Sequence, residues 1–128
     1  MHQVEYVVND FNNSIKFLNE NGIIFIDDVF PQNEEEQYKV PTNPIYENNI
    51  LKYSSPWTGD VWKFIYYLLV FHKDSVNFEI FLHHNYRGVI QIIPTSFLQI
   101  SQEALEIIND YDYTKDFDNY KNILNNNL

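Results

Sequence analysis

Two stretches of the chain combine acidic side chains with tyrosine, a pairing of residue types that suits the binding of a cationic surface. The first stretch, residues 27–38, carries five acids and no base, with three consecutive glutamates at 34–36 shortly before Tyr38. The second, residues 103–118, carries six acids against Lys115 alone. Tyrosine rings stack on arginine and lysine while carboxylates pair with their charge. The pattern therefore indicates a docking surface for a basic protein.

A second interpretation of the same acids also stays open. Carboxylates keep loops and helix ends soluble, and near a helix N-terminus they interact favourably with the helix dipole. Tyrosine and tryptophan contacts tend to carry most of the binding energy at interfaces. The candidate partner-binding residues are acids of both stretches, without Glu103 and Glu106, together with the neighbouring rings: Asp27, Asp28, Glu34, Glu35, Glu36, Tyr38, Trp57, Asp110, Tyr111, Asp112, Tyr113, Asp116 and Asp118.

Residues for catalysis or metal binding form no pattern of this kind. His83 and His84 are adjacent on a predicted strand and point to opposite faces, so they cannot ligate one metal from that strand alone. The chain has no cysteine and three glycines, which leaves neither a thiolate site nor a glycine-rich phosphate loop. No serine has the flanking glycines of a nucleophile elbow. We expect no enzymatic activity, no metal and no cofactor.

The overall charge limits the possible partners. The 128 residues carry 18 acids and 8 bases, a net charge of −10, which repels nucleic acid and anionic lipid and attracts basic proteins. The first residues lack a signal-peptide pattern, and the longest apolar run, 61–71, is too short to cross a bilayer. We expect a cytoplasmic protein that binds neither nucleic acid nor membrane and is a monomer or a weak dimer.

The elements that position the acidic stretches begin with an N-terminal helix. Apolar residues follow helical spacing over 11–18, with Asp10 as the predicted N-cap and Gly22 as a stop signal. Residues 3–8 fit either an extension of this helix or a short strand, and the pattern does not decide between them. One domain covering residues 1–128 is long enough to bury a substantial core.

The middle of the chain predicts strands. Residues 23–26 indicate a buried strand, and the proline-rich segment 31–49 an ordered but irregular loop, which is uncommon without a function. Residues 61–71 are rich in aromatic and β-branched side chains and predict a central strand, with Trp62 and Tyr66 in the core. Two further strands are expected, joined by turns in an antiparallel meander: 76–84 and 89–93, with turns at 72–75 and 85–88.

The C-terminal part of the chain predicts two helices. Ser101 is the expected cap of the first and Thr114 of the second, and the tail after them should fray. The predicted fold class is therefore α+β: an antiparallel β-meander of three or more strands packed with an N-terminal helix and two C-terminal helices.

In overall character the chain resembles bacterial immunity proteins, because it is small, acidic, free of cysteine and without a signal or catalytic motif. Such proteins neutralise the toxic domain of contact-dependent growth inhibition and other polymorphic toxin systems. The resemblance implies an antitoxin that binds a cognate toxin domain, of a basic nuclease type, and blocks the path of its substrate. A nuclease is positive where it meets phosphate, so a carboxylate-lined partner can steer its own encounter with it.

Two other classes of function stay open. A phage-type acidic mimic of nucleic acid would repeat its carboxylates along one long face, whereas here they flank a nearly neutral segment. A small enzyme or ligand-binding domain would need a deep pocket with convergent polar groups.

Overall fold

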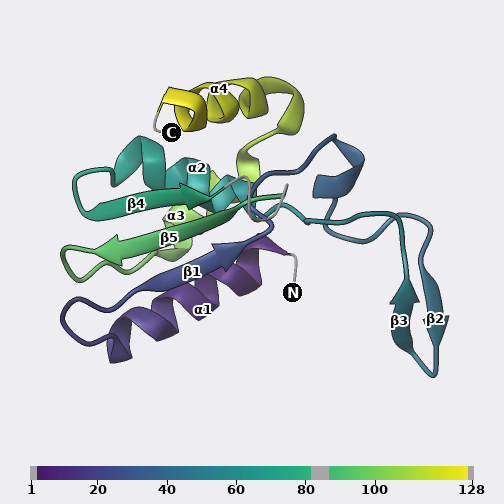
Figure 1. The fold of residues 1–128 in the computed structure, drawn as a ribbon, viewed down its shortest axis with the longest axis horizontal. Coiled ribbons are helices and arrows are strands. Elements are labelled where there is room, and N and C mark those ends of the chain that lie inside the picture. The colour runs from purple at the N-terminus through teal and green to yellow at the C-terminus, as the bar shows by residue number, and fades with distance from the viewer. Residues whose placement is uncertain (1–2, 82–86, 127–128) are drawn as a thin grey trace.

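A three-stranded antiparallel sheet forms the centre of the molecule (Figure 1). Its strands are β1 (Ile24–Asp27), β4 (Val76–Phe81) and β5 (Val89–Pro94), in the order β1-β5-β4, so β5 pairs with both neighbours. The structure is a computed structural model that describes residues 3–81 and 87–126. The predicted strand residues 82–84 and residues 85–86 of the predicted turn lie outside the described residues, as do His2, His83, His84 and the last two residues of the tail.

Helices cover one face of this sheet. They are α1 (Val4–Phe17), α2 (Trp62–Phe71), α3 (Gln102–Asp110) and α4 (Tyr113–Asn126), of which the first three pack against one another. The inner face of the sheet supplies Ile26, Ile90 and Ile92 to the core, while Phe25, one residue along β1, is 62% exposed on the other face. This alternation is what a strand with one buried face requires. The α+β class and the helices at both chain ends are as predicted.

The predicted strand at 61–71 is wrong, because this segment forms helix α2. Its side chains are buried on almost every side, with Trp62, Phe64, Ile65 and Leu68 fully enclosed between the sheet and the other helices. A helix surrounded by protein is apolar all round, and a short apolar run does not distinguish it from a buried strand. The third strand of the sheet is instead β1, from the segment predicted at 23–26.

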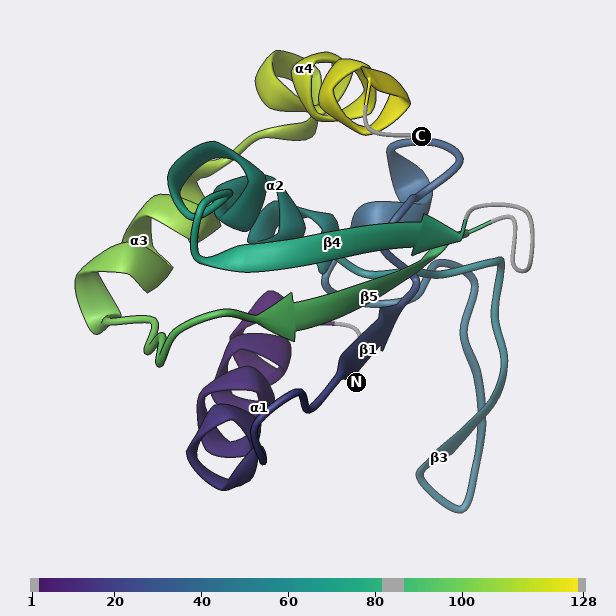
Figure 2. The same ribbon diagram turned by 60° about the vertical axis from the view of Figure 1, so that its left-hand side comes forward.

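Helix α4 packs on α2 through aromatic rings. Trp62 lies at the centre, with ring centroids 5.2 Å from Phe117, 5.5 Å from Tyr120 and 6.4 Å from Tyr113. The Tyr120 hydroxyl donates to the backbone carbonyl of Val29 at 2.6 Å, so α4 is also joined to the segment that follows β1. Both ribbon views show α4 lying along the top of the molecule beside that segment (Figures 1 and 2).

The segment from 31 to 49 is more regular than its sequence predicts. It contains the short 3-10 helix η1 (Glu35–Gln37) and strand β2 (Ile45–Glu47), which forms a hairpin with β3 (Ile50–Tyr53). Asn48 and Asn49 form its two-residue turn with φ of 53° and 64°. Positive φ at both positions is the geometry of a type I′ turn, whose twist matches that of paired strands.

Two predicted helix caps are wrong and one is correct. Helix α1 begins at Val4, directly after Gln3, so residues 4–8 are helical and Asp10 lies inside the helix. The cap of α1 comes from Asp60 instead, whose Oδ1 accepts from the Val4 amide at 2.8 Å. Ser101 caps α3 as predicted, by accepting from the Ala104 amide at 3.1 Å.

The cap of α4 is Asp112 rather than Thr114. Asp112 Oδ1 accepts from the Thr114 amide at 2.8 Å, and Asp116 Oδ2 accepts from the Asp112 amide at 2.9 Å. The two carboxylates thus satisfy amide groups at the helix start that would otherwise have no partner within the helix. A carboxylate is also favoured at this position by the helix dipole.

Candidate partner-binding site

The three consecutive glutamates of the first acidic stretch, at 34–36, have different surroundings. Glu36 is 5% exposed and forms a two-pronged ion pair with Arg87, with Nε–Oε1 and Nη2–Oε2 distances of 2.9 Å each. Its Oε1 also accepts from the Gln32 amide at 3.2 Å. Glu34 and Glu35 are exposed. Of the predicted docking residues, Glu36 is therefore placed inside the protein, where its carboxylate pairs with Arg87.

The backbone of Glu36 is also fixed, by hydrogen bonds to its carbonyl oxygen. Its carbonyl oxygen accepts from the amides of Thr58 and Gly59 at 2.8 and 2.9 Å and from the Thr58 hydroxyl at 3.1 Å. Both neighbours precede α2 and are buried. Hydrogen bonds of this kind to buried backbone fix the loop that carries Glu34 and Glu35 in one position.

A second ionic cluster fixes the other end of the loop. Lys39 Nζ lies 2.6 Å from Glu5 Oε1 and 2.7 Å from the buried carboxylate of Asp60, and it donates to Asn109 Oδ1 at 3.3 Å. Burial alone would lower the pKa of Lys39, but its contacts with Asp60 and Glu5 outweigh burial and raise the pKa. The cluster joins the loop to α1, to Asp60 in the turn that leads into α2, and to α3.

These contacts place the first acidic stretch beside the start of α4. Trp62 Nε1 donates to Gln37 Oε1 at 3.1 Å, and the same indole makes an edge contact with Tyr113. Burial, followed by the charges of Glu34, Asp118 and Glu36, raises the pKa of Tyr113. Carboxylates from both stretches therefore act on one tyrosine ring.

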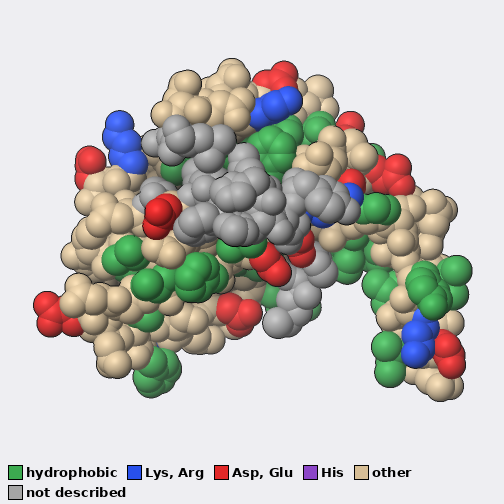
Figure 3. Space-filling model, in the orientation of Figure 1, with side chains coloured by type: hydrophobic (Ala, Val, Ile, Leu, Met, Phe, Trp, Pro, Cys, Tyr) green, Lys and Arg blue, Asp and Glu red, His purple; other side chains and the backbone are tan. Residues whose placement is uncertain are grey.

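We call this surface the acidic corner and define it by Glu34, Glu35, Tyr38, Tyr113 and Asp118. The two glutamates and Asp118 are exposed, Tyr38 is 46% exposed, and Tyr113 is half-buried and stacked on Phe117 with centroids 4.5 Å apart. Within residues 3–81 and 87–126 no ion pair is recorded for these three carboxylates. Figure 3 shows Asp and Glu side chains over the loop that carries η1 and over α4.

The remaining acidic candidates are distributed around this corner. Asp27 is the exposed last residue of β1, and Asp28 follows it, half-buried, with φ of 56°. Asp110 is the exposed last residue of α3. Asp112 and Asp116 form the cap of α4 described above. The contacts that join the two stretches involve η1 and α4, and they do not include Asp27 or Asp28.

The other two aromatic candidates have structural contacts. Tyr111 is half-buried against Tyr66 at 4.7 Å, and burial, with smaller effects of Tyr66, Asp116 and Tyr67, raises its pKa to about 12. The indole of Trp57, also half-buried, donates to the Tyr38 carbonyl at 2.7 Å. Each ring keeps some exposed surface that a partner can contact, but each also makes contacts within its own chain.

Arg87 is the site residue that the sequence analysis missed. It lies 51 positions from Glu36, in the turn before β5, so no local pattern pairs the two. The one indication in the sequence was the distribution of charge. A buried carboxylate needs a cationic partner, and the nearly neutral middle of the chain holds four bases that can pair with one of the three adjacent glutamates.

Two observations bear on the catalytic and membrane alternatives. In the part of the chain that the structure describes, no group of three or more histidine or acidic side chains is placed to hold a metal ion. Among the described helices, none combines the length and apolar character needed to cross a membrane.

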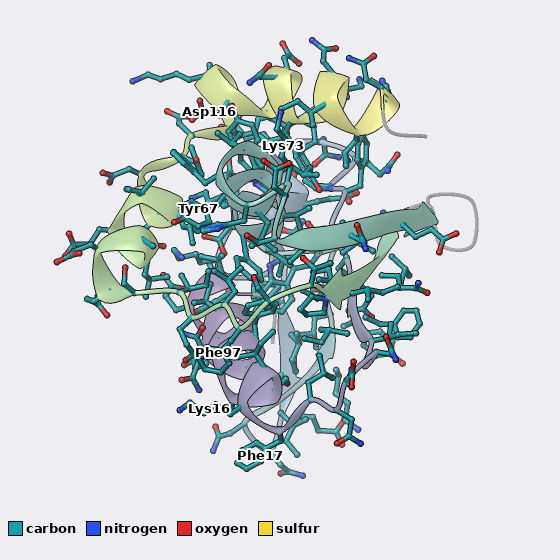
Figure 4. All side chains as sticks on the ribbon, turned by 90° about the vertical axis from the view of Figure 1, so that its left-hand side faces the viewer. Lys16, Phe17, Tyr67, Lys73, Phe97 and Asp116 are labelled. Atoms are coloured by element: carbon teal, nitrogen blue, oxygen red, sulfur yellow. The ribbon has the colours of Figure 1, made fainter. Side chains whose placement is uncertain are left out.

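A cavity of about 500 Å³ opens where α1 ends, near the ends of β4 and β5. Its polar lining is mainly amides and hydroxyls, among them Asn19, Asn77 and Ser96, with Glu20 as the one acidic side chain. Phe97 is one of its lining residues, and Figure 4 shows Phe97 and Phe17 near the end of α1. This lining has no pair of titratable groups for acid–base catalysis.

No protein-family model, curated protein or solved structure matches this chain.

Proposed function

We propose that this protein is an immunity-type inhibitor that binds a basic toxin domain in the cytoplasm through the acidic corner. The observation that carries the proposal is the meeting of two stretches, distant in sequence, at one pair of rings: the Trp62 indole donates to Gln37 and contacts the Tyr113 ring, and the exposed Glu34 and Asp118 lie close enough to act on Tyr113. The partner is a protein domain with a positively charged substrate cleft of the nuclease type.

The rigidity of the corner supports this function. The loop with Glu34 and Glu35 is held by the Glu36–Arg87 pair on one side and the Lys39 cluster on the other. Carboxylates fixed before binding lose little conformational freedom when a partner arrives, so more of the electrostatic attraction remains as affinity. Exposed charges at an interface also raise the association rate by steering the encounter.

Charge reversal with a matched control tests the proposal. The double variant E34K/E35K and the control E103K/E106K, which changes exposed residues of α3, both shift the net charge from −10 to −6. Binding is measured by stopped flow with a basic nuclease-type toxin domain that the wild-type protein binds. We expect the corner variant to slow association about tenfold or more and the control about twofold. Glu36 is left unchanged, because its reversal would disturb the fold.

Growth of cells that express the toxin domain gives the second readout. The control variant should protect these cells as wild type does, and the corner variant should not. Equal loss of association rate in both variants would mean that net charge alone attracts the partner. Unchanged binding in the corner variant would contradict the proposal outright. A wild-type association rate that does not fall between 10 and 150 mM salt would also contradict it, because the Debye length shrinks from about 30 to about 8 Å over this range.

A further inference from the structure

The β2–β3 hairpin projects from the body as a separate arm. In both ribbon views it extends on the same side of the molecule as β1 and α1, and Figure 3 shows an open hollow between it and the body. Among the described residues, no other element makes substantial contact with either strand. An isolated two-stranded hairpin is at best marginally stable in water. The arm therefore lacks the packing that would normally support it.

The arm carries apolar side chains that nothing in the described part of its own chain covers. Ile45, Tyr46, Ile50 and Tyr53 are 59%, 58%, 64% and 73% exposed. The strands are paired nonetheless, since the asparagine turn sets the register of Glu47 opposite Ile50 and Tyr46 opposite Leu51, and an irregularity then brings Ile45 opposite Tyr53. A locally encoded hairpin with four exposed large side chains is a surface suited to binding.

The body offers a matching acceptor. Within residues 3–81 and 87–126, strand β1 is an edge of the sheet, because it pairs with β5 on one side and with no described strand on the other. Beside this edge lies a groove of about 330 Å³ between β1 and α1, lined by apolar residues such as Val7, Phe11 and Phe25 and flanked by Asp10 and Asp27. An unpaired edge presents amide and carbonyl groups that accept a further strand.

We propose that the arm of one copy docks on the β1 edge of a second copy and that the exchange is reciprocal. The strand lengths agree, since β1 and β3 have four residues each and β2 has three. One side chain of the arm fills the groove between β1 and α1, and one strand of the arm extends the sheet of the other copy. Reciprocal exchange gives a two-fold symmetric dimer, the commonest form of homo-oligomer.

The area available is sufficient for such a dimer. Aromatic side chains bury roughly 150–250 Å² each, so the exposed fractions of Tyr46 and Tyr53 correspond to roughly 100–150 Å² per ring. Ile45, Ile50 and Tyr53 share one face of the hairpin, whereas Tyr46 lies on the other face. At roughly 100 Å² for each side chain, this face of an arm offers on the order of 300 Å². Two arms, counted with the surfaces that they cover, bury about 1,200 Å² in total, which is at the lower end of the range of stable specific interfaces.

Charge favours a second copy over the basic partner of the acidic corner. The arm, residues 45–53, contains one acid and one base, Glu47 and Lys52, whereas the whole chain carries −10. A neutral arm offers no attraction to a cationic domain, but it lets two acidic chains touch where their mutual repulsion is least. The dimer should therefore tighten as salt rises, opposite to binding at the acidic corner.

Sedimentation equilibrium of the full chain tests the proposal. We expect the mass to rise from 15.4 kDa toward twice that value with concentration, and the dimer dissociation constant to fall severalfold between 20 and 300 mM sodium chloride. A mass that stays at 15.4 kDa up to millimolar concentration overturns the proposal and leaves the arm to a different protein. A dimer that weakens as salt rises overturns it as well.

Mixing two defective variants identifies the contact. Y46E/I50E alters the arm and F25E the acceptor edge, and each alone should weaken the dimer about tenfold or more. Their mixture should form mixed dimers, because the intact arm of the F25E chain meets the intact edge of the arm variant. F17E, at an exposed residue of α1 outside the groove, is the control and should dimerise as wild type. Dimers that persist in both defective variants, or a mixture that stays monomeric, would overturn the arm-on-edge assignment.

Discussion

Because Glu36 pairs with Arg87, replacing Glu36 should destabilise the fold far more than replacing its neighbours Glu34 and Glu35. Replacing Glu36 by glutamine keeps the size of the side chain and removes its charge. Arg87, whose side chain is 14% exposed, then loses its carboxylate partner while it remains largely buried. Breaking one side of a buried pair costs about 3–5 kcal/mol, because the remaining charge is desolvated without compensation.

The expected cost of E36Q lies at the lower end of that range. The glutamine oxygen can still accept one hydrogen bond from the guanidinium or from the Gln32 amide, and part of Arg87 reaches solvent. We expect a loss of about 3 kcal/mol in the free energy of unfolding. An unfolding entropy of about 2.1 cal/mol/K per residue then predicts a fall in Tm of roughly 11 °C for a chain of 128 residues.

Urea unfolding followed by tryptophan fluorescence measures this loss, with E34Q and E35Q as matched controls. Both controls lie on exposed side chains of the same loop and should change stability by less than about 0.5 kcal/mol. Equal stabilities of E36Q and E35Q would refute the reasoning, since they would mean that the buried ion pair contributes nothing to the fold. An R87Q/E36Q double variant less destabilised than the sum of its single variants would establish that the two residues interact.

Three further outcomes follow from the contacts described above. D112A should cost about 1 kcal/mol in thermal unfolding because it removes the cap of α4, whereas T114A should cost less than about 0.5 kcal/mol; a reversed order would contradict the cap assignment. The pKa of Tyr111 is about 12 in the folded chain against 10 in the unfolded chain, so its effect on stability is fully present below pH 10 and is lost as the pH rises toward 12. The stability of Y111F, measured by circular dichroism, should therefore fall less between pH 10 and pH 12 than that of wild type. N48V, which forces a β-branched residue into positive φ, should speed amide exchange in β2 and β3 and leave the Tm of the body within about 2 °C.

The parts of the fold that sequence predicted are those encoded by neighbouring residues. The strands at 23–26 and 89–93 have short apolar runs with clear ends, and Ser101 stands directly before a helical pattern. The segment 61–71 failed because its secondary structure is decided by burial on all sides, which composition alone cannot reveal. The cap of α1 failed for a related reason, since its acceptor, Asp60, comes from 56 residues away.

In the candidate site too, the features set by neighbouring residues were predictable and those set by distant contacts were not. Adjacent carboxylates and tyrosines marked the two stretches correctly as sources of exposed acid, and Glu34, Glu35 and Asp118 are exposed. The role of Glu36 could not be read from its neighbours, because Arg87 approaches it only in the folded chain. The hairpin had a local signal in its two consecutive asparagines, which tolerate positive φ, but without a glycine that signal is weak.

The most direct test of the central claim is hydrogen exchange on the complex with a basic nuclease-type domain that the protein binds. The account predicts that binding slows amide exchange in residues 33–38 and 111–118, the two segments of the acidic corner, and leaves β4 and α3 unchanged. Protection confined to the outer face of the sheet or to the cavity near Phe97, with the corner exchanging as in the free protein, would contradict it.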